Sequence, residues 1–368
     1  MPTYDQTQTV FALSMLSNLG SGIEGTVAEI ESKAFTAINA ELSSAEPAIG
    51  KWSVIWGPAV YQAPNSKIAD NVMVVFQAGA GSSIPGQIVA GIAGTNPYSA
   101  FDWVFEDFLV IVSTPWETGN PGNLKPRISL GTAIGLSILK ALVPGPGLPG
   151  ASKTLNNFLD STLTAPALLT ISGHSLGGAL SPAMALYLSD TKAAWDPSGF
   201  ATLACLPSAG PTSGNGDFAS YYDAVLGTVT ARVHNRLDVV PHGWESDDLV
   251  ELPTIYSPDI PATLELYSLL VAALAISASV GYTQIDTSTR LNGSINTQLI
   301  DPSKSDCDNY IAQMNYQHVQ AYFDLLGVGV SPRMSTLFAQ ASAQALPKMR
   351  LNLTRRQMMR QRAKTAPA

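Results

Sequence analysis

The chain has 368 residues, of which 46% are hydrophobic and only 13% are charged, against about 25% charged residues in an average soluble domain. This length and apolar content exclude a disordered chain, because enough hydrophobic surface is present to bury a sizeable core. The net charge is −8, and since seven basic and no acidic residues lie beyond residue 347, residues 1–347 carry −15. Such an acidic body excludes a nucleic-acid reader, whose folded part should be basic.

The first residues do not resemble a secretion signal. No basic residue precedes Lys33, so the positively charged segment that opens such a signal is missing. We therefore expect a cytoplasmic protein, with export by another route as the alternative. The longest nearly apolar run, Leu266–Val280, would form a helix of about 22 Å, which is too short for the ~30 Å hydrocarbon core of a bilayer.

The predicted elements change character along the chain. Residues 1–45 have the apolar spacing of helices, with a repeat of three to four positions. From residue 52 onward short β-type runs follow, separated by Gly, Pro and Ser: Trp52–Tyr61, Val72–Gln77 and Gln87–Ala93. Helical patterns return at 128–142 and near 151–160, on either side of a Pro- and Gly-rich segment.

Beyond residue 160 strands and helices alternate. Strands are expected at Ala167–Ser172, Phe200–Leu206 and Thr228–His234, and helices at Leu176–Ser189 and Asp217–Val225. Such alternation is typical of the α/β class, with a mainly parallel sheet and helices on both faces. We expect one domain over residues 1–346, including the helical region 1–45, followed by a basic tail over residues 347–368.

The sequence Gly173-His174-Ser175-Leu176-Gly177 fits G-x-S-x-G, the pattern of a nucleophile elbow. In this motif a serine lies on a strained turn between a strand and a helix, and glycines flank it because the turn leaves no space for a Cβ atom. An apolar run precedes the motif and an alanine-rich helical segment follows it. Ser175 is therefore the predicted nucleophile, and the Leu176 N–H at the helix start is a predicted oxyanion donor. The alternative is a glycine-rich turn with an incidental serine.

A serine nucleophile needs a base, and the chain has four histidines. His174 lies inside the elbow, where its side chain points away from the serine, and His234 and His242 lie in or just after a predicted strand. His318, far downstream, remains as the base. In folds built around a nucleophile elbow, the serine is followed along the chain first by the acid and then by the histidine. Asp238 is therefore the expected acid, because it lies between Ser175 and His318 in the loop after a predicted strand. The spare acids are Asp247, Asp248 and Asp308, and each of these residues taken alone could be structural.

Several segments in sequence order carry a family resemblance: Ile88–Asn96, Asp102-Trp103 with Asp107, Gly173–Leu180, Ser208–Asn215 and Arg232–Pro241. They resemble the strand with its R-G-T turn, the D-W-x-x-D-L segment, the elbow, the G-x-P-x-x-G-N segment and the R-x-x-x-x-x-D-x-V-P run of the class 3 (fungal-type) triacylglycerol lipases, in the α/β-hydrolase superfamily. The last of these runs bears that family's catalytic aspartate, and His318 lies where its histidine falls. The similarity covers residues 52–325.

This resemblance implies further site residues. Thr95 would supply a second oxyanion donor, and residues 96–108 would form a lid that covers the serine in water and moves aside at a lipid surface. The aromatic candidates for contact with lipid in this segment are Tyr98, Phe101, Trp103 and Phe105. The alternative for these aromatic residues is ordinary core packing.

The sequence departs from the family pattern in three places. Ala93 replaces the arginine before Gly-Thr, so an ion pair that would brace the oxyanion turn is missing. Pro182 lies inside the helix after the elbow and predicts a kink there.

The third departure is the long interval between the predicted acid and base, which contains Leu266–Val280. Within this run Leu266 and Leu270 are candidates for a second lid, a wall of the acyl pocket or a helix that dips into a membrane. The alternative is a buried helix of the core.

These features predict a serine carboxylic-ester hydrolase that acts on lipid esters through an acyl-serine intermediate. An esterase or phospholipase for other acyl esters, and a non-catalytic lipid-binding protein with this fold, are the alternatives. Neither a metal nor an organic cofactor is implied, and the expected partners are the lipid substrate and, transiently, a membrane or lipid interface. The basic tail 347–368 could bind an anionic surface or be simply solvated, and the sequence indicates no oligomeric state.

Overall fold

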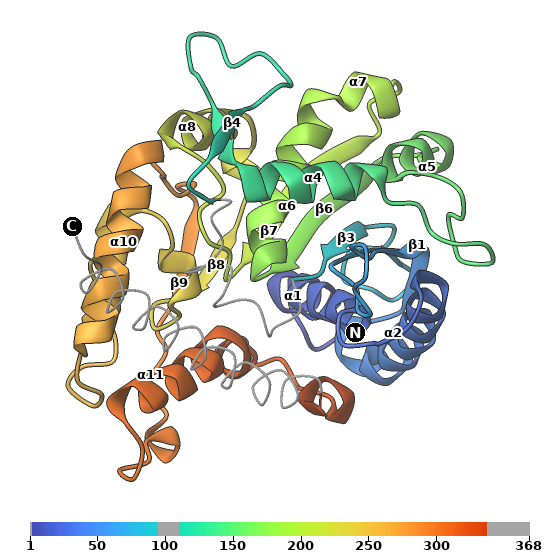
Figure 1. Ribbon diagram of the computed structural model, residues 1–368. Helices are drawn as coiled ribbons and strands as arrows, with labels where there is room; N and C mark the ends of the chain where they lie inside the picture. Colours follow the sequence, from blue (N-terminus) through green and yellow to red (C-terminus); the bar gives the residue numbers. More distant parts are fainter. Residues whose placement is uncertain (1, 95–109, 337–368) are drawn as a thin grey trace.

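A seven-stranded sheet runs through the centre of the computed structural model, which describes residues 2–94 and 110–336 (Figure 1). Its strands are β1 (Trp52–Tyr61), β2 (Asn71–Ala78), β3 (Ile88–Ile92), β6 (Ala167–His174), β7 (Ala201–Ser208), β8 (Arg232–Asn235) and β9 (Ser288–Leu291). They are arranged in this same order across the sheet. From β3 to β9 neighbouring strands are parallel, whereas β1, β2 and β3 pair antiparallel. The mainly parallel sheet predicted from the sequence is therefore confirmed.

Helices cover both faces of this sheet. They are α1 (Gln6–Ser17), α2 (Val27–Ile49), α4 (Leu130–Ala141), α5 (Leu155–Thr162), α6 (Leu176–Asp190), α7 (Lys192–Trp195), α8 (Gly216–Leu226), α9 (Ser246–Leu249), α10 (Leu264–Val280), α11 (Asp306–Asn315) and α12 (Ala321–Leu326). A separate antiparallel pair, β4 (Ser113–Pro115) and β5 (Arg127–Ser129), lies just before α4 in the chain. At Pro182, where the sequence predicts a kink, α6 continues as one helix from Leu176 to Asp190.

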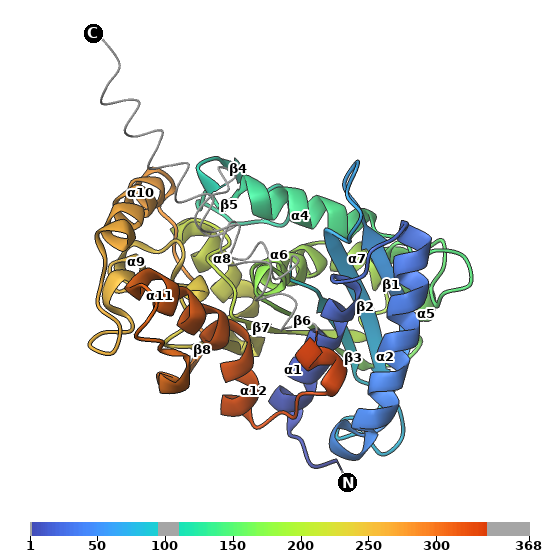
Figure 2. The ribbon, with the colours of Figure 1, turned by 60° about the horizontal axis from the view of Figure 1, so that its bottom comes forward.

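Alternate residues of the central strands enter two hydrophobic cores, one on each face of the sheet. In β2, Met73 and Val75 belong to one core, whereas Val72, Val74 and Phe76 belong to the other, as the two-residue period of a strand requires. The first core is closed by α4, α5, α6 and α8, and the second by α1, α2 and α12 (Figure 2). Burial of both faces explains why these strands are nearly continuous apolar runs in the sequence.

The structure differs from the predicted elements mainly at their ends. The helical region 1–45 is divided into α1 and α2 by a 3₁₀ turn, η1 (Asn18–Gly20), and α2 begins afresh at a capping box formed by Thr26 and Glu29. Strand β8 begins only at Arg232, because the first part of the predicted strand forms the 3₁₀ turn η4 (Gly227–Val229). The sequence pattern predicts no strand at the position of β9, because the side chains of β9 are mostly exposed and form no apolar run.

A third hydrophobic cluster lies beside the β8–β9 end of the sheet. It joins Leu237 and Val239, in the loop after β8, to Ala273 of α10 and Tyr310 of α11. Helix α10 confirms the helix predicted for the apolar run, but only Ala273 and Ser277 of it are buried. A helix with so few buried side chains lies on the surface, so the alternative of a buried core helix is wrong. No helix among the described residues is long and apolar enough to cross a bilayer.

Candidate active site

Ser175 occupies a strained turn between β6 and α6. Its backbone angles are φ 63° and ψ −124°, in a region that costs a non-glycine residue on the order of 1–3 kcal/mol. Two glycines make this turn sterically accessible. A Cβ atom on Gly173 would lie 2.4 Å from the carbonyl oxygen of Gly177, and one on Gly177 would lie 2.2 Å from the carbonyl oxygen of Ile92. The local sequence thus permits the conformation that lifts the serine hydroxyl above the sheet.

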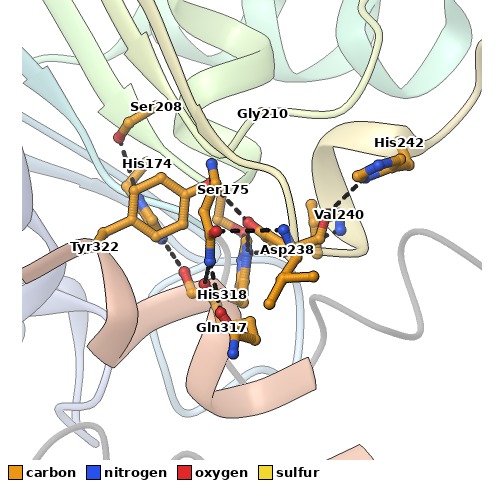
Figure 3. Close-up of polar contacts among 12 residues, drawn as sticks. His174, Ser175, Ser208, Gly210, Asp238, Val240, His242, Gln317, His318 and Tyr322 are labelled. Carbon is orange, nitrogen blue, oxygen red and sulfur yellow. Dashed lines mark hydrogen bonds and ion pairs between the residues drawn. The ribbon is translucent and has the colours of Figure 1, made fainter. Parts of the chain in front are cut away.

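Ser175, His318 and Asp238 come from three distant parts of the chain and lie in hydrogen-bonding contact (Figure 3). Ser175 Oγ is 2.8 Å from His318 Nε2, and His318 Nδ1 is 2.9 Å from Asp238 Oδ2 and 3.1 Å from Oδ1. Because a carboxylate only accepts hydrogen bonds, Nδ1 carries the imidazole proton, which leaves Nε2 to accept the Ser175 hydroxyl. All three side chains are buried.

The Asp238 carboxylate is held by two donors besides His318. The Val240 N–H donates to Oδ1 at 3.0 Å and the Tyr322 hydroxyl donates to Oδ2 at 2.9 Å. Burial, followed by the negative charge of Asp238, raises the pKa of Tyr322 well above its ordinary value, so the phenol keeps its proton. The same hydroxyl accepts the Asn235 N–H at 2.9 Å. Tyr322 therefore orients the carboxylate, and no sequence motif marked it for this role.

His318 lies in a π-helical turn, η8 (Tyr316–Gln320), between α11 and α12. Such wide turns are often found at functional sites. The adjacent Gln317 is fully buried; its side chain accepts the Asn235 side-chain N–H at 2.7 Å and donates to the Ser294 carbonyl at 2.7 Å. The Asn235 side-chain oxygen accepts two backbone N–H groups. This buried amide pair connects the loop of Asp238 to the turn of His318.

His174 points away from Ser175 and contacts the turn of His318 instead. Its Nε2 is 2.7 Å from the His318 carbonyl oxygen, and its Nδ1 is 3.1 Å from Ser208 Oγ (Figure 3). A carbonyl only accepts, so Nε2 carries the proton. Burial, followed by the proximity of His318, lowers the pKa of His174 well below its ordinary value. A neutral His174 therefore connects the nucleophile elbow to the backbone of the predicted base.

The neutral state of His174 predicts a specific loss of stability in acid. In the unfolded chain an imidazole binds a proton below about pH 6.5, whereas the folded protein resists this protonation. The unfolded state then binds more protons, so the free energy of unfolding falls as the pH falls, by up to about 1.4 kcal/mol per pH unit. We expect urea unfolding at pH 7 and pH 5 to show a smaller difference for His174→Asn than for the wild type. Equal differences would contradict this assignment.

The Leu176 N–H is the first amide of α6 and lies at the end of the helix that favours negative charge. Its position next to Ser175 suits an oxyanion. The second predicted donor, the aromatic candidates of the lid segment and the basic tail lie outside the described residues: Thr95, Tyr98, Phe101, Trp103, Phe105 and 347–368.

The turn that leads to Thr95 is held from the N-terminal region. The Gly94 N–H donates to Asn18 Oδ1 at 2.9 Å, and the buried Asn18 amide in turn donates to the carbonyls of Ser14 and Met15 at 3.3 Å. A neutral side chain from η1 thus braces the turn at which the family pattern has an arginine and this chain has Ala93. Sequence reasoning missed Asn18, because nothing within its own segment connects it to residue 94.

The remaining candidates lie apart from Ser175. Leu266 and Leu270 are partly buried against the third hydrophobic cluster, so they face the protein.

His234 and His242 line a polar cavity of about 660 Å³ between α8, β8 and β9. Burial, followed by the charge of Arg232, lowers the pKa of His234 to about 3. His242 Nδ1 is 2.7 Å from the Asp238 carbonyl oxygen rather than its carboxylate.

The spare acids also lie elsewhere. Asp248 lines the polar cavity, and Asp308 accepts the Ser305 hydroxyl at 2.9 Å. A second cavity, of about 800 Å³ and largely apolar, runs along α4, and neither Ser175, Asp238 nor His318 lines it. Within residues 2–94 and 110–336, no group of three or more His, Cys, Asp or Glu side chains is arranged to hold a metal ion.

Comparisons with known proteins connect this geometry to a family. The model of the family "Lipase (class 3)" matches residues 129–245, which include the elbow and Asp238. The solved structure of M37 lipase is 33% identical, with a TM-score of 0.79, and the match covers 88% of this chain and 93% of that one. No curated protein matches the chain.

Fungal lipases show a more distant likeness. Rhizomucor miehei lipase in complex with its propeptide is 14% identical, with a TM-score of 0.46 and coverage of 87% of this chain and 80% of that one. Lipase II from Rhizopus niveus is 16% identical, with a TM-score of 0.43 and coverage of 67% and 78%. These two matches are too weak to support a family assignment, whereas the likeness to M37 lipase extends over nearly the whole of both chains. The protein belongs to the class 3 lipase family of α/β-hydrolases and is a carboxylic ester hydrolase.

Proposed function

We propose that this lipase hydrolyses lipid esters through an acyl-serine intermediate, with Ser175 as nucleophile, His318 as base and Asp238 as acid. The observation that supports this most is the unbroken hydrogen-bonded chain from Ser175 Oγ through the imidazole to the buried carboxylate. As Ser175 attacks the ester carbonyl, its proton passes to His318 Nε2, and the adjacent carboxylate stabilises the imidazolium.

The reaction then proceeds in two halves. The imidazolium returns its proton to the leaving alcohol, so the C–O bond of the ester breaks and an acyl group stays on Ser175. Water, deprotonated by His318, attacks this acyl group, and the carboxylic acid leaves while Ser175 regains its proton. The Leu176 N–H faces the negative oxygen in both halves, and Thr95 is proposed as its second donor on the family resemblance. A lost oxyanion donor typically costs 10²–10³ in rate.

Triacylglycerols are the proposed substrates, and phospholipids or shorter acyl esters are the alternatives. The family assignment supports lipid esters in general, and the resemblance of the elbow and of the Asp238 run to triacylglycerol lipases supports the narrower choice. A substrate series from p-nitrophenyl acetate to emulsified triolein distinguishes them. The highest turnover on emulsified triolein would support the proposal, and a preference for dissolved short esters would contradict it.

Labelling with a fluorophosphonate tests the proposed nucleophile directly. The reagent phosphonylates serines whose hydroxyl is activated by a base, so we expect one label per chain, on the peptide that contains Ser175. The His318→Ala variant should label far more slowly, because the base is missing while the serine remains. A chain that takes no label and hydrolyses no p-nitrophenyl ester would instead fit the non-catalytic lipid-binding alternative.

A further inference from the structure

Helix α10 consists mostly of apolar residues, yet one of its faces is exposed. Its 17 residues include a single charged side chain, Glu265. The exposed fractions of Leu264, Tyr267 and Val271 are 79%, 46% and 69%, and their spacing of three and four residues places them on one face. Leu264 and Val271 are the two most exposed large apolar side chains in the part of the chain that the structure describes.

The opposite face of α10 already has a partner. Ala273 and Ser277 are buried, and Leu266, Leu270 and Leu274 pack against the third hydrophobic cluster. That cluster also contains Leu237 and Val239, the neighbours of Asp238 on either side. A helix that is hydrophobic all round is normally enclosed by protein or lipid, and α10 is enclosed on one side only.

The helix is fixed in place rather than loosely hinged. Ser277 Oγ lies 2.8 Å from Ser246 Oγ, and just beyond the helix the Tyr282 hydroxyl donates to the Val110 carbonyl at 2.7 Å. The Thr263 hydroxyl caps the N-terminus, and Gly281 ends the helix in the left-handed conformation. In both ribbon views α10 lies at the outer edge of the molecule, on the side opposite α2, and Figure 1 shows it beyond β9. Its outward face is therefore exposed to solvent.

We propose that this outward face of α10, formed by Leu264, Tyr267 and Val271, is a docking surface for an uncharged lipid–water interface. The inference rests on the proposed function, because the substrate of a lipase lies at such an interface. Exposed apolar patches mark sites of contact with another protein or with a membrane, and α10, with 17 residues, is too short to cross a bilayer. The face has no charge to pair with a charged headgroup, and the chain carries −8, so a neutral surface fits it better than an anionic one.

A second copy of the chain fits this face less well. A stable dimer commonly buries about 800 Å² on each partner, and three large side chains on one helix face supply only part of that area. A lipid surface needs no such minimum, because each side chain that enters it adds its own burial. The cluster shared by α10 and the Asp238 loop would then keep the docked surface and the site in a fixed relation.

The test compares two double variants in the full chain. Leu264→Asp with Val271→Asp places charges on the proposed docking surface. Val225→Asp with Val229→Asp changes two exposed valines at the end of α8 and in η4 and serves as the matched control. Binding is measured by flotation with triolein droplets coated with phosphatidylcholine, and p-nitrophenyl butyrate in solution reports on fold and site.

We expect the α10 variant to bind the droplets about 10–100-fold more weakly than the wild type, since each lost apolar contact changes the binding constant by about tenfold. Its hydrolysis of dissolved p-nitrophenyl butyrate should be unchanged, and the control should bind as the wild type does. Equal binding by the two double variants would overturn the proposal. So would a wild-type dimer, seen by sedimentation, that only the α10 substitutions dissociate while droplet binding persists. A wild type that binds droplets through α10 but hydrolyses no ester would refute the proposed function and leave the docking surface supported.

Discussion

Ser175→Ala should reduce kcat on p-nitrophenyl butyrate by about 10⁵-fold or more, because losses of this size follow removal of the nucleophile from a triad that acts as a unit. The alanine has no oxygen to attack the ester, and neither His318 nor the Leu176 N–H can replace it. The KM should change little, since the hydroxyl contributes to the reaction more than to binding of the ester. Steady-state kinetics on the purified chain measure both constants.

Ser172→Ala provides the matched control for this experiment. Ser172 lies on β6, just before the turn of Ser175; it is fully buried and donates to the Leu206 carbonyl at 2.7 Å. Its loss should lower the free energy of unfolding by about 1 kcal/mol and leave kcat nearly unchanged. Wild-type turnover in Ser175→Ala would show that the hydrolysis occurs at another residue.

Asp238→Asn should lower kcat by about 10⁴-fold, as seen when the acid of such a triad becomes an amide. The carboxylate accepts from His318 Nδ1, Val240 N–H and the Tyr322 hydroxyl. An amide has one oxygen for these three donors, and its N–H₂ group next to Nδ1 favours the imidazole tautomer whose proton faces Ser175. In that tautomer His318 cannot accept the serine proton.

Asp308→Asn and Asp248→Asn are the matched controls for the acid. Each removes one negative charge. Asp308 accepts the Ser305 hydroxyl and Asp248 lines the polar cavity, whereas the carboxylate at His318 Nδ1 is that of Asp238. We expect both variants to keep kcat close to that of the wild type, with circular dichroism confirming that all three variants are folded. If Asp308→Asn lost activity and Asp238→Asn retained it, the assignment of the acid would be wrong.

How much of the site the sequence predicts depends on how local each feature is. The elbow is local, since Gly173, Ser175 and Gly177 together determine the turn, and its strand–turn–helix setting is readable from the flanking residues. Asp238 and His318 are not marked by a local pattern of this kind; they are predicted as acid and base from the chain order and from the family resemblance. The role of the lid segment 96–108 and the single domain over 1–346 stay predictions.

The supporting residues could not be predicted, because their partners are far away in sequence. Asn18 holds Gly94, and Tyr322 holds Asp238 across 84 positions. Gln317 pairs with Asn235 across a similar distance. None of them belongs to a motif, and a buried amide or phenol in a helix has no periodicity that identifies its partner. They meet only in the folded chain, where β3 and β8, the strands that precede Gly94 and Asp238, belong to one sheet.

The contact between α1 and α12, near the two ends of the described chain, has a consequence for biosynthesis. Phe11 of α1 stacks on Tyr322 of α12, with ring centroids 6.4 Å apart, and the same Tyr322 fixes the Asp238 carboxylate. A site assembled from both ends of a chain depends on contacts of long sequence separation, which form slowly. A ribosome must therefore synthesise more than 300 residues before His318 can meet Ser175, so we expect the growing polypeptide to be inactive toward esters up to that point.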